Sequence, residues 1–178
     1  MKTQKFMRLA GLVMMFILVA VFSQAKDPAA KTDKKDETLA LTLTGYVVET
    51  YFDEEGKEQE KLVPLEKAVF PGDIIHYEII GKNTAGKPLR DVHVGGKIPY
   101  GTAYVDKSAA HDQKGEFLVS TNGGGTFAKP PIIIKVTQPN GTVKEVIVPP
   151  EKYTNIQFTI PEIKKKGKFS GSYRVAVK

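Results

Sequence analysis

Cysteine is absent from all 178 residues, which excludes disulfides, a thiol nucleophile and any thiolate metal site. A domain exposed to an oxidising compartment would then be held by its core alone, and about 140 residues can bury enough apolar area for that. Tryptophan is also absent. Because sugar-binding sandwiches commonly present flat aromatic platforms, this counts against such a role, although Tyr46, Tyr51, Tyr100 and Tyr104 remain able to contribute.

Motifs for catalysis are lacking as well. None of the candidate serines, Ser108, Ser120, Ser170 and Ser172, stands in a Gly-x-Ser-x-Gly sequence, the turn that presents many hydrolytic nucleophiles. The glycine-rich stretch 122–126 has neither the lysine nor the following helix of a phosphate-binding loop. We therefore predict a protein that is not an enzyme and that carries no cofactor and no catalytic residue.

The N-terminus has the pattern of a secretory signal peptide. Its first residues include three cations, Lys2, Lys5 and Arg8. An apolar run over 9–22 follows, and small residues then lead to a predicted cleavage between Ala25 and Lys26. The run is short for a membrane span, which needs about 20 apolar residues, so no stable span is expected after cleavage. An uncleaved anchor ending near Gln24 is the alternative.

Removal of residues 1–25 changes the charge balance. The whole chain carries a formal charge of +6, and Lys2, Lys5 and Arg8 supply half of it, whereas no acidic residue lies in this segment. The remaining +3 is spread over a surface of mixed charge. Nucleic-acid binding needs a concentrated basic patch, so we expect no nucleic-acid partner.

The rest of the chain alternates between apolar and polar residues with the period of a β-strand. Residues 26–38 are charged and small and predict a flexible linker. Predicted strands and strand pairs separated by turn residues follow over 39–52, 61–70, 74–80, 89–98, 102–106, 116–120, 131–150, 153–163 and 169–178. No long stretch of helical periodicity interrupts them. We expect residues 39–178 to form a single immunoglobulin-like antiparallel β-sandwich.

Three local features refine this prediction. The first strand places Leu39, Leu41 and Leu43 on one face, and Gly45 suggests a bulge that reverses the facing. Pro64 cannot donate to a ladder, so its strand should lie at a sheet edge. The Asn-Gly pair at 140–141 favours a hairpin with a type I′ turn.

Residues 70–109 carry a set of turn and strand residues at fixed spacings: Pro71, Gly72, Asp73, Tyr77, Asn83, Pro99, Gly101, Tyr104 and Val105. In this the chain resembles the bacterial surface-protein family catalogued as domain of unknown function 11, over roughly 68–178. The resemblance implies an immunoglobulin-like fold and an envelope location, and it implies no reaction. The chain departs from the family pattern at 95–98, where an Asp often precedes the Pro-x-Gly turn, and no second repeat or sorting motif is found.

Three groups of polar residues are candidate sites. His76 and His93 could share a metal if their strands pair, and His111 lies in a polar loop, but surface histidines are the more common interpretation. The carboxylates at 53–60 lack the spacing of a calcium loop, so we predict no metal site. The basic turn Lys164–Lys168 could attach weakly to anionic lipid or polysaccharide.

Together these features predict a non-catalytic module of the cell envelope or surface, exported to the periplasm or beyond. It would act in adhesion or assembly through contact with an envelope or surface protein, at sheet edges where a partner strand can add. The alternative is a periplasmic sandwich that binds a sugar or a metal through its 100–130 loops.

Overall fold

The computed structural model describes residues 38–66 and 68–178. The predicted signal peptide, its cleavage between Ala25 and Lys26, and nearly all of the linker lie outside the described residues. The named elements, in chain order, are β1 (Leu39–Phe52), β2 (Glu58–Pro64), β3 (Ile74–Asn83), β4 (Leu89–Lys97), β5 (Thr102–Tyr104), β6 (Ala110–His111), β7 (Glu116–Ser120), β8 (Ile133–Thr137), β9 (Val143–Ile147), the 3-10 turn η1 (Pro150–Lys152), β10 (Asn155–Ile163) and β11 (Lys168–Val177). In this part of the chain, no helix is both long and apolar enough to cross a membrane.

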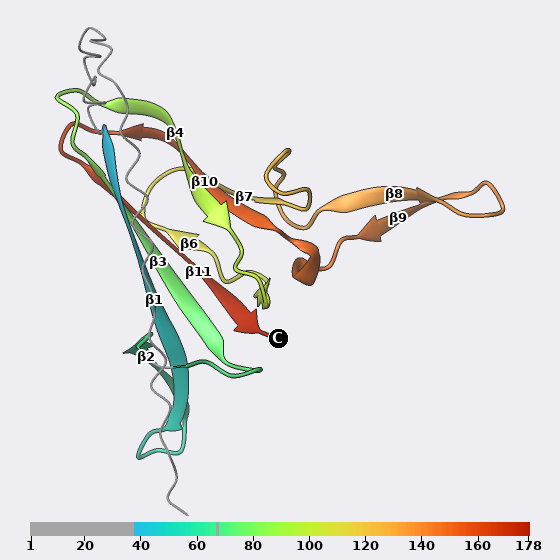
Figure 1. Ribbon diagram of the computed structural model, residues 1–178, viewed down its shortest axis with the longest axis horizontal. Coiled ribbons are helices and arrows are strands. Elements are labelled where there is room, and N and C mark those ends of the chain that lie inside the picture. The colour runs from blue at the N-terminus through green and yellow to red at the C-terminus, as the bar shows by residue number, and fades with distance from the viewer. Residues whose placement is uncertain (1–37, 67) are drawn as a thin grey trace, which may run out of the picture. The chain divides into compact units, whose positions relative to one another are not determined.

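The strands form two packed antiparallel sheets and a separate ribbon (Figure 1). The larger sheet has the order β2-β1-β3-β11-β5, with β6 also paired to β11, and the smaller has the order β4-β10-β7. The ribbon consists of β8 and β9 alone. The predicted all-β, immunoglobulin-like sandwich is confirmed, and so is the placement of the Pro64-bearing strand, β2, at a sheet edge.

A row of four aromatic rings joins the two sheets through the core. Tyr104 of β5 stacks on Phe117 of β7, with ring centroids 5.5 Å apart. Phe117 contacts Phe158 of β10 at 5.3 Å, and Phe158 contacts Phe169 of β11 at 5.5 Å. Phe158 and Phe169 are at most 1% exposed. Because rings in tilted or offset contact bury large apolar areas, this row holds the two sheets together in a chain that can form no disulfide.

The structure corrects two expectations for β1. Its pairing with β3 runs without interruption from Leu39 opposite Asn83 to Val47 opposite Ile75, so Gly45 is not a bulge. Gly45 instead leaves room for Leu65, because a Cβ at position 45 would lie 3.0 Å from that side chain.

The second correction concerns the apolar face of β1. Leu41 and Leu43 share the inward face with the buried Ile79 as predicted, yet they are 56% and 60% exposed. The smaller sheet has fewer strands and does not extend over this edge. The periodicity therefore identified the correct face, while the width of the opposing sheet determines how much of it is buried.

Gly171 marks the closest approach of backbone and core rings. A Cβ at this position would lie 2.7 Å from the Phe169 ring and 3.1 Å from the Phe158 ring, and neither ring can move because both are fully packed. We expect Gly171→Ala to lower the free energy of unfolding by about 1–3 kcal/mol, the usual range for overpacking. Gly96→Ala is the matched control, since nothing lies within 4 Å of its added Cβ. Urea unfolding of both variants measures the difference, and equal stabilities would contradict this view of the core.

Candidate functional site

The motif residues of the first turn hold the end of the larger sheet. Gly72 has a φ of +99° and donates its backbone N–H to the carbonyl of Val177. The Asp73 carboxylate accepts a hydrogen bond from the backbone N–H of Phe70 at 2.7 Å, as expected for a turn aspartate. Pro71 is exposed at the turn's surface. These residues build the turn, and their hydrogen bonds to Val177 and Phe70 are structural.

Asn83 is the polar residue of the motif that is buried and contacts four backbone groups. It is 2% exposed. Its amide nitrogen lies 3.0–3.1 Å from three carbonyl oxygens, those of Lys87, Ile163 and Lys164, and its Oδ1 accepts from the N–H of Ala85. Its φ does not lie in the left-handed region that asparagine can adopt. Asn83 therefore ties the larger sheet to the end of the smaller one.

The second half of the motif is also structural. Gly101 has a φ of +79°, and the Pro99 carbonyl accepts a hydrogen bond from the Thr102 hydroxyl at 2.7 Å. Tyr104 is only 3% exposed, so it cannot contribute to a sugar platform. Val105 donates its N–H to the Arg174 carbonyl. Tyr77 stacks on Tyr173 with ring centroids 5.4 Å apart, and burial raises the pKa of Tyr173 to about 12.

The histidines do not share a site. His76 lies on β3 of the larger sheet and His93 on β4 of the smaller one, so the pairing that would bring them together does not occur. His93 is exposed and contacts the side chain of Gln157 at 2.6 Å. His111 does not lie in a free loop: it belongs to β6, and its ring packs edge-on against that of Phe158 in β10. No group of three or more ligating side chains occurs within the described ranges.

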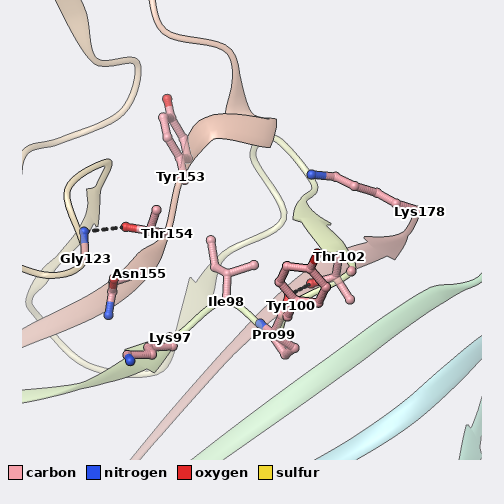
Figure 2. A pocket seen from close by; sticks show the side chains of 11 residues that line it. Lys97, Ile98, Pro99, Tyr100, Thr102, Gly123, Tyr153, Thr154, Asn155 and Lys178 are labelled. Atoms are coloured by element: carbon pink, nitrogen blue, oxygen red, sulfur yellow. Dashed lines mark hydrogen bonds between the residues drawn. The ribbon is translucent and has the colours of Figure 1, made fainter.

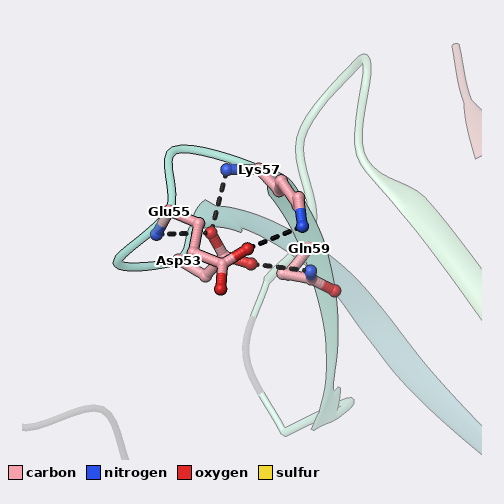
Figure 3. Close-up of polar contacts among 4 residues, drawn as sticks. All are labelled: Asp53, Glu55, Lys57 and Gln59. Atoms are coloured by element: carbon pink, nitrogen blue, oxygen red, sulfur yellow. Dashed lines mark hydrogen bonds and ion pairs between the residues drawn. The ribbon is translucent and has the colours of Figure 1, made fainter.

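In the acidic turn at 53–60, the carboxylates of Asp53 and Glu55 bind neighbouring groups of the same turn (Figure 3). The Asp53 carboxylate accepts hydrogen bonds from Gln59 Nε2 and from the backbone N–H groups of Glu55 and Lys57, all within 3.0 Å. These contacts, led by that of Gln59, lower the pKa of Asp53. Lys57 pairs with Glu55 at 2.6 Å. Asp53 and Glu55 are thus engaged within the turn itself.

An ion pair crosses the outer face of the larger sheet above His76. Arg174 of β11 donates two hydrogen bonds to the Glu60 carboxylate of β2, at 2.9 and 2.6 Å. These strands are not neighbours, so the pair passes over β1 and β3. The His76 side chain is only 14% exposed, and its Nδ1 has no hydrogen-bond partner among the described residues. Burial, followed by the charge of Arg174, lowers the pKa of His76.

An open groove lies at the end of the sandwich where β4 leads into β5 (Figure 2). The Tyr100 side chain is fully exposed at its rim, and the basic residues Lys97 and Lys178 also line it. Asn155 is 8% exposed and lines the same groove, and its Oδ1 has no hydrogen-bond partner in the described part. The groove thus offers a ring, two cations and a buried amide.

Several lysines lie close together at the end of the sandwich opposite the groove. Lys114 lines one hollow with Lys164, Lys82 lies opposite Lys168 across the β3–β11 ladder, and the carbonyls of Lys87 and Lys164 meet at Asn83. None of these lysines, nor Lys165 or Lys166, makes an ion pair within the described residues. The predicted basic turn Lys164–Lys168 is therefore part of a larger basic cluster.

The β8–β9 ribbon is the most unusual surface of the molecule. All of its strand residues are exposed, and neither strand pairs with a third. Large aliphatic side chains cover both faces: Ile133, Ile134, Val136, Val143, Val146 and Ile147, each 37–62% exposed. Only the base is anchored, where the half-buried Ile132 and Val148 pack against the core. Figure 1 shows the ribbon projecting away from both sheets.

The turn of the ribbon differs from the predicted type I′ geometry. Such a turn needs a positive φ at both central residues, but only Gly141 has one, at +81°. The N–H of Gly141 bonds to the carbonyl of Gln138, and Gln138 closes the ladder on Thr142. This is a three-residue loop in which Gly141 takes the left-handed position. The hairpin itself was predicted, but its separation from the sheets was not.

Comparison with known proteins gives only a distant structural similarity. No family model matches the chain, and no curated protein matches it. The crystal structure of a protein described as membrane anchored, from Corynebacterium diphtheriae, aligns over 82% of this chain with 16% identity and a TM-score of 0.43. The aligned part is 29% of that protein, so the chain spans less than a third of its length. The similarity says nothing about partners or activity.

The half-buried His76 predicts a pH dependence of stability. Its pKa is lowered in the folded state, so as pH falls below about 6.5, the ordinary value for histidine, the unfolded chain takes up a proton that the folded chain resists. Stability is then lost as pH falls from that value toward the lower folded-state pKa. We expect His76→Gln to lose less stability than wild type between pH 7.5 and 5.0 in urea unfolding. His93→Gln, at an exposed position, is the control, and an unchanged profile for His76→Gln would contradict the assignment.

Proposed function

We propose that the protein is a non-catalytic, exported module of the cell envelope or surface that acts by protein contact through the β8–β9 ribbon. The observation that carries this proposal is the ribbon's exposure of aliphatic side chains on both faces, with neither strand edge paired. Isolated two-stranded hairpins are marginally stable in water, and unpaired edges invite a further strand. A partner that covers a face or pairs with an edge would therefore stabilise this ribbon.

Two other features support the envelope setting. The signal-peptide pattern of 1–25 and the resemblance to domain of unknown function 11 both favour export, and both remain predictions. The basic cluster around Lys164–Lys168 suits weak, salt-sensitive attachment to anionic lipid or polysaccharide, separate from the ribbon. The lack of cysteine makes the proposal easy to test, because one introduced thiol is unique.

We expect a thiol at the ribbon to be reachable from outside the cytoplasm and to lie near another protein. Lys144→Cys places it on exposed β9, and Lys87→Cys places it in the exposed β3–β4 turn. In cells that make the protein, both thiols should react with a membrane-impermeant maleimide without lysis of the cytoplasm. A photoreactive maleimide should then crosslink position 144, but not position 87, to an envelope protein or to a second copy.

The two parts of this experiment fail separately. Labelling that requires cytoplasmic lysis would contradict export. Efficient labelling without a crosslink specific to position 144 would contradict contact through the ribbon.

A second candidate function is supported by the groove at Tyr100. An exposed ring beside two lysines and a buried amide oxygen without a hydrogen-bond partner in the described residues suits an acidic sugar, through ring stacking, charge and one hydrogen bond. If the protein binds one, a galacturonic-acid oligosaccharide should raise its melting temperature. Tyr100→Ala should weaken binding by about tenfold, or roughly 1.4 kcal/mol. Tyr51→Ala, which removes an exposed ring from β1, should not, and a neutral oligosaccharide that binds equally well would argue against charge recognition.

A further inference from the structure

The free edges of the ribbon follow from its hydrogen bonding. Val148 donates to the Ile132 carbonyl and Gln138 to the Thr142 carbonyl, so the even-numbered pairs are the hydrogen-bonded ones. In an antiparallel ladder the intervening pairs direct their N–H and C=O groups outward. The outer edge of β8 therefore presents the backbone of Ile133, Lys135 and Thr137. The outer edge of β9 presents that of Val143, Glu145 and Ile147.

A second copy can add to these edges in two ways. If β9 of one copy pairs with β8 of the next, the copies are related by a translation across the strands, so both sandwiches lie at the same end of the sheet. They would then be about 10 Å apart, which is two strand spacings. A two-layer sandwich is wider than this, because its sheets alone pack about 10 Å apart. If β8 pairs with β8, or β9 with β9, the antiparallel two-fold axis places the sandwiches at opposite ends.

Charge selects among the two-fold pairings. An antiparallel two-fold places one residue opposite its own symmetry mate, and like charges directly opposite are destabilising. On β9 the registers centred on Lys144 and Glu145 each set a charge against itself. The register centred on Val146 does not, but it carries the turn of the second copy past Val148, where the ribbon joins the core. On β8 the register centred on Lys135 also sets a charge against itself, and the register centred on Ile134 carries the turn of the second copy past Ile132, again where the ribbon joins the core.

The register centred on Val136 sets no charge against itself. It sets Val136 against its mate and Lys135 opposite Thr137 of the second copy, twice. Lys135 and Thr137 are the residues whose backbone groups point outward, so both can form hydrogen-bonded pairs. Lys135 also keeps its place opposite Glu145 within its own ribbon. Val136 and Ile134, which are 39% and 46% exposed, then lie on one face of a four-stranded sheet.

We propose that the partner of the ribbon is a second copy of this chain, paired through β8 in an antiparallel two-fold dimer centred on Val136. The proposal rests on the interaction role proposed for the ribbon. The resulting sheet has the order β9-β8-β8-β9 across the two copies. It pairs the outward backbone groups of Lys135 and Thr137 in both ribbons, and an isologous interface of this kind is closed at the dimer.

A disulfide test addresses the two-fold directly. Val136 would form a non-hydrogen-bonded pair with its mate, with Cα atoms about 4.5 Å apart, which lies within the range that a disulfide spans. Since the chain has no cysteine, purified Val136→Cys should oxidise to a covalent dimer. Val146→Cys has a similar exposure but lies on β9, separated from its mate by both β8 strands, and should stay largely monomeric on denaturing gels.

A charge test separates pairing from damage to the ribbon. Val136→Lys and Val136→Glu each set like charges together at the two-fold, so each variant alone should sediment as a monomer at concentrations where wild type is a dimer. An equimolar mixture should form a heterodimer, because the introduced lysine of one copy then faces the introduced glutamate of the other, while each ribbon remains as it was in the single variant. Val146→Lys mixed with Val146→Glu is the control and should leave dimerisation near that of wild type.

The outcomes are distinct from those of the cellular experiment. A wild-type protein that remains monomeric at high concentration, or equal oxidation of the two cysteine variants, would overturn the dimer. A crosslink at position 144 to a different envelope protein would still support the proposed function. Conversely, a Val136-centred dimer in a chain that is never exported would uphold the dimer and overturn the envelope role.

Discussion

The packing of the two sheets depends on one buried amide. Asn83 lies where β3 ends, and its side chain reaches the carbonyls of Ile163 and Lys164 at the end of β10. A buried carbonyl without a hydrogen-bond donor costs about 1–3 kcal/mol, and a turn that leaves one sheet for the other exposes several. By contacting these carbonyls together with that of Lys87, Asn83 holds together the two turns that connect the sheets, β3 to β4 and β10 to β11. The aromatic row can then pack between sheets whose separation is fixed.

The same contact determines the surface at that end. Because the carbonyls of Lys87 and Lys164 converge on Asn83, the charged side chains of both turns project from neighbouring points. The ladder between β3 and β11 adds Lys82 opposite Lys168. A basic cluster is therefore a consequence of the polar contact beneath it. The sequence shows only the run Lys164–Lys168, since the other lysines are more than 40 residues away.

Most strands could be predicted from the sequence because each needs only local alternation. The range 39–52 agrees with β1, and 116–120 agrees with β7. What could not be predicted depends on distant residues: His76 and His93 fall in different sheets, and Leu41 and Leu43 stay exposed because the opposing sheet is narrow. The predicted type of the turn at Asn140–Gly141 was wrong for another reason. Its sequence suits two loop lengths, and the register of Gln138 opposite Thr142 decides between them.

The ribbon shows where local pattern and tertiary context separate. Consecutive aliphatic residues, such as Ile133 with Ile134 and Val146 with Ile147, occupy both faces of a strand, which is typical of a strand buried on both sides. Here nothing in the described chain covers either face. Exposed edges are normally protected by charges or proline, and β8 carries one lysine, Lys135, which lies opposite Glu145 of β9 in the ladder. A single charge that lies opposite an acidic residue gives little protection to the edge, so β8 keeps the features of a strand that can be paired.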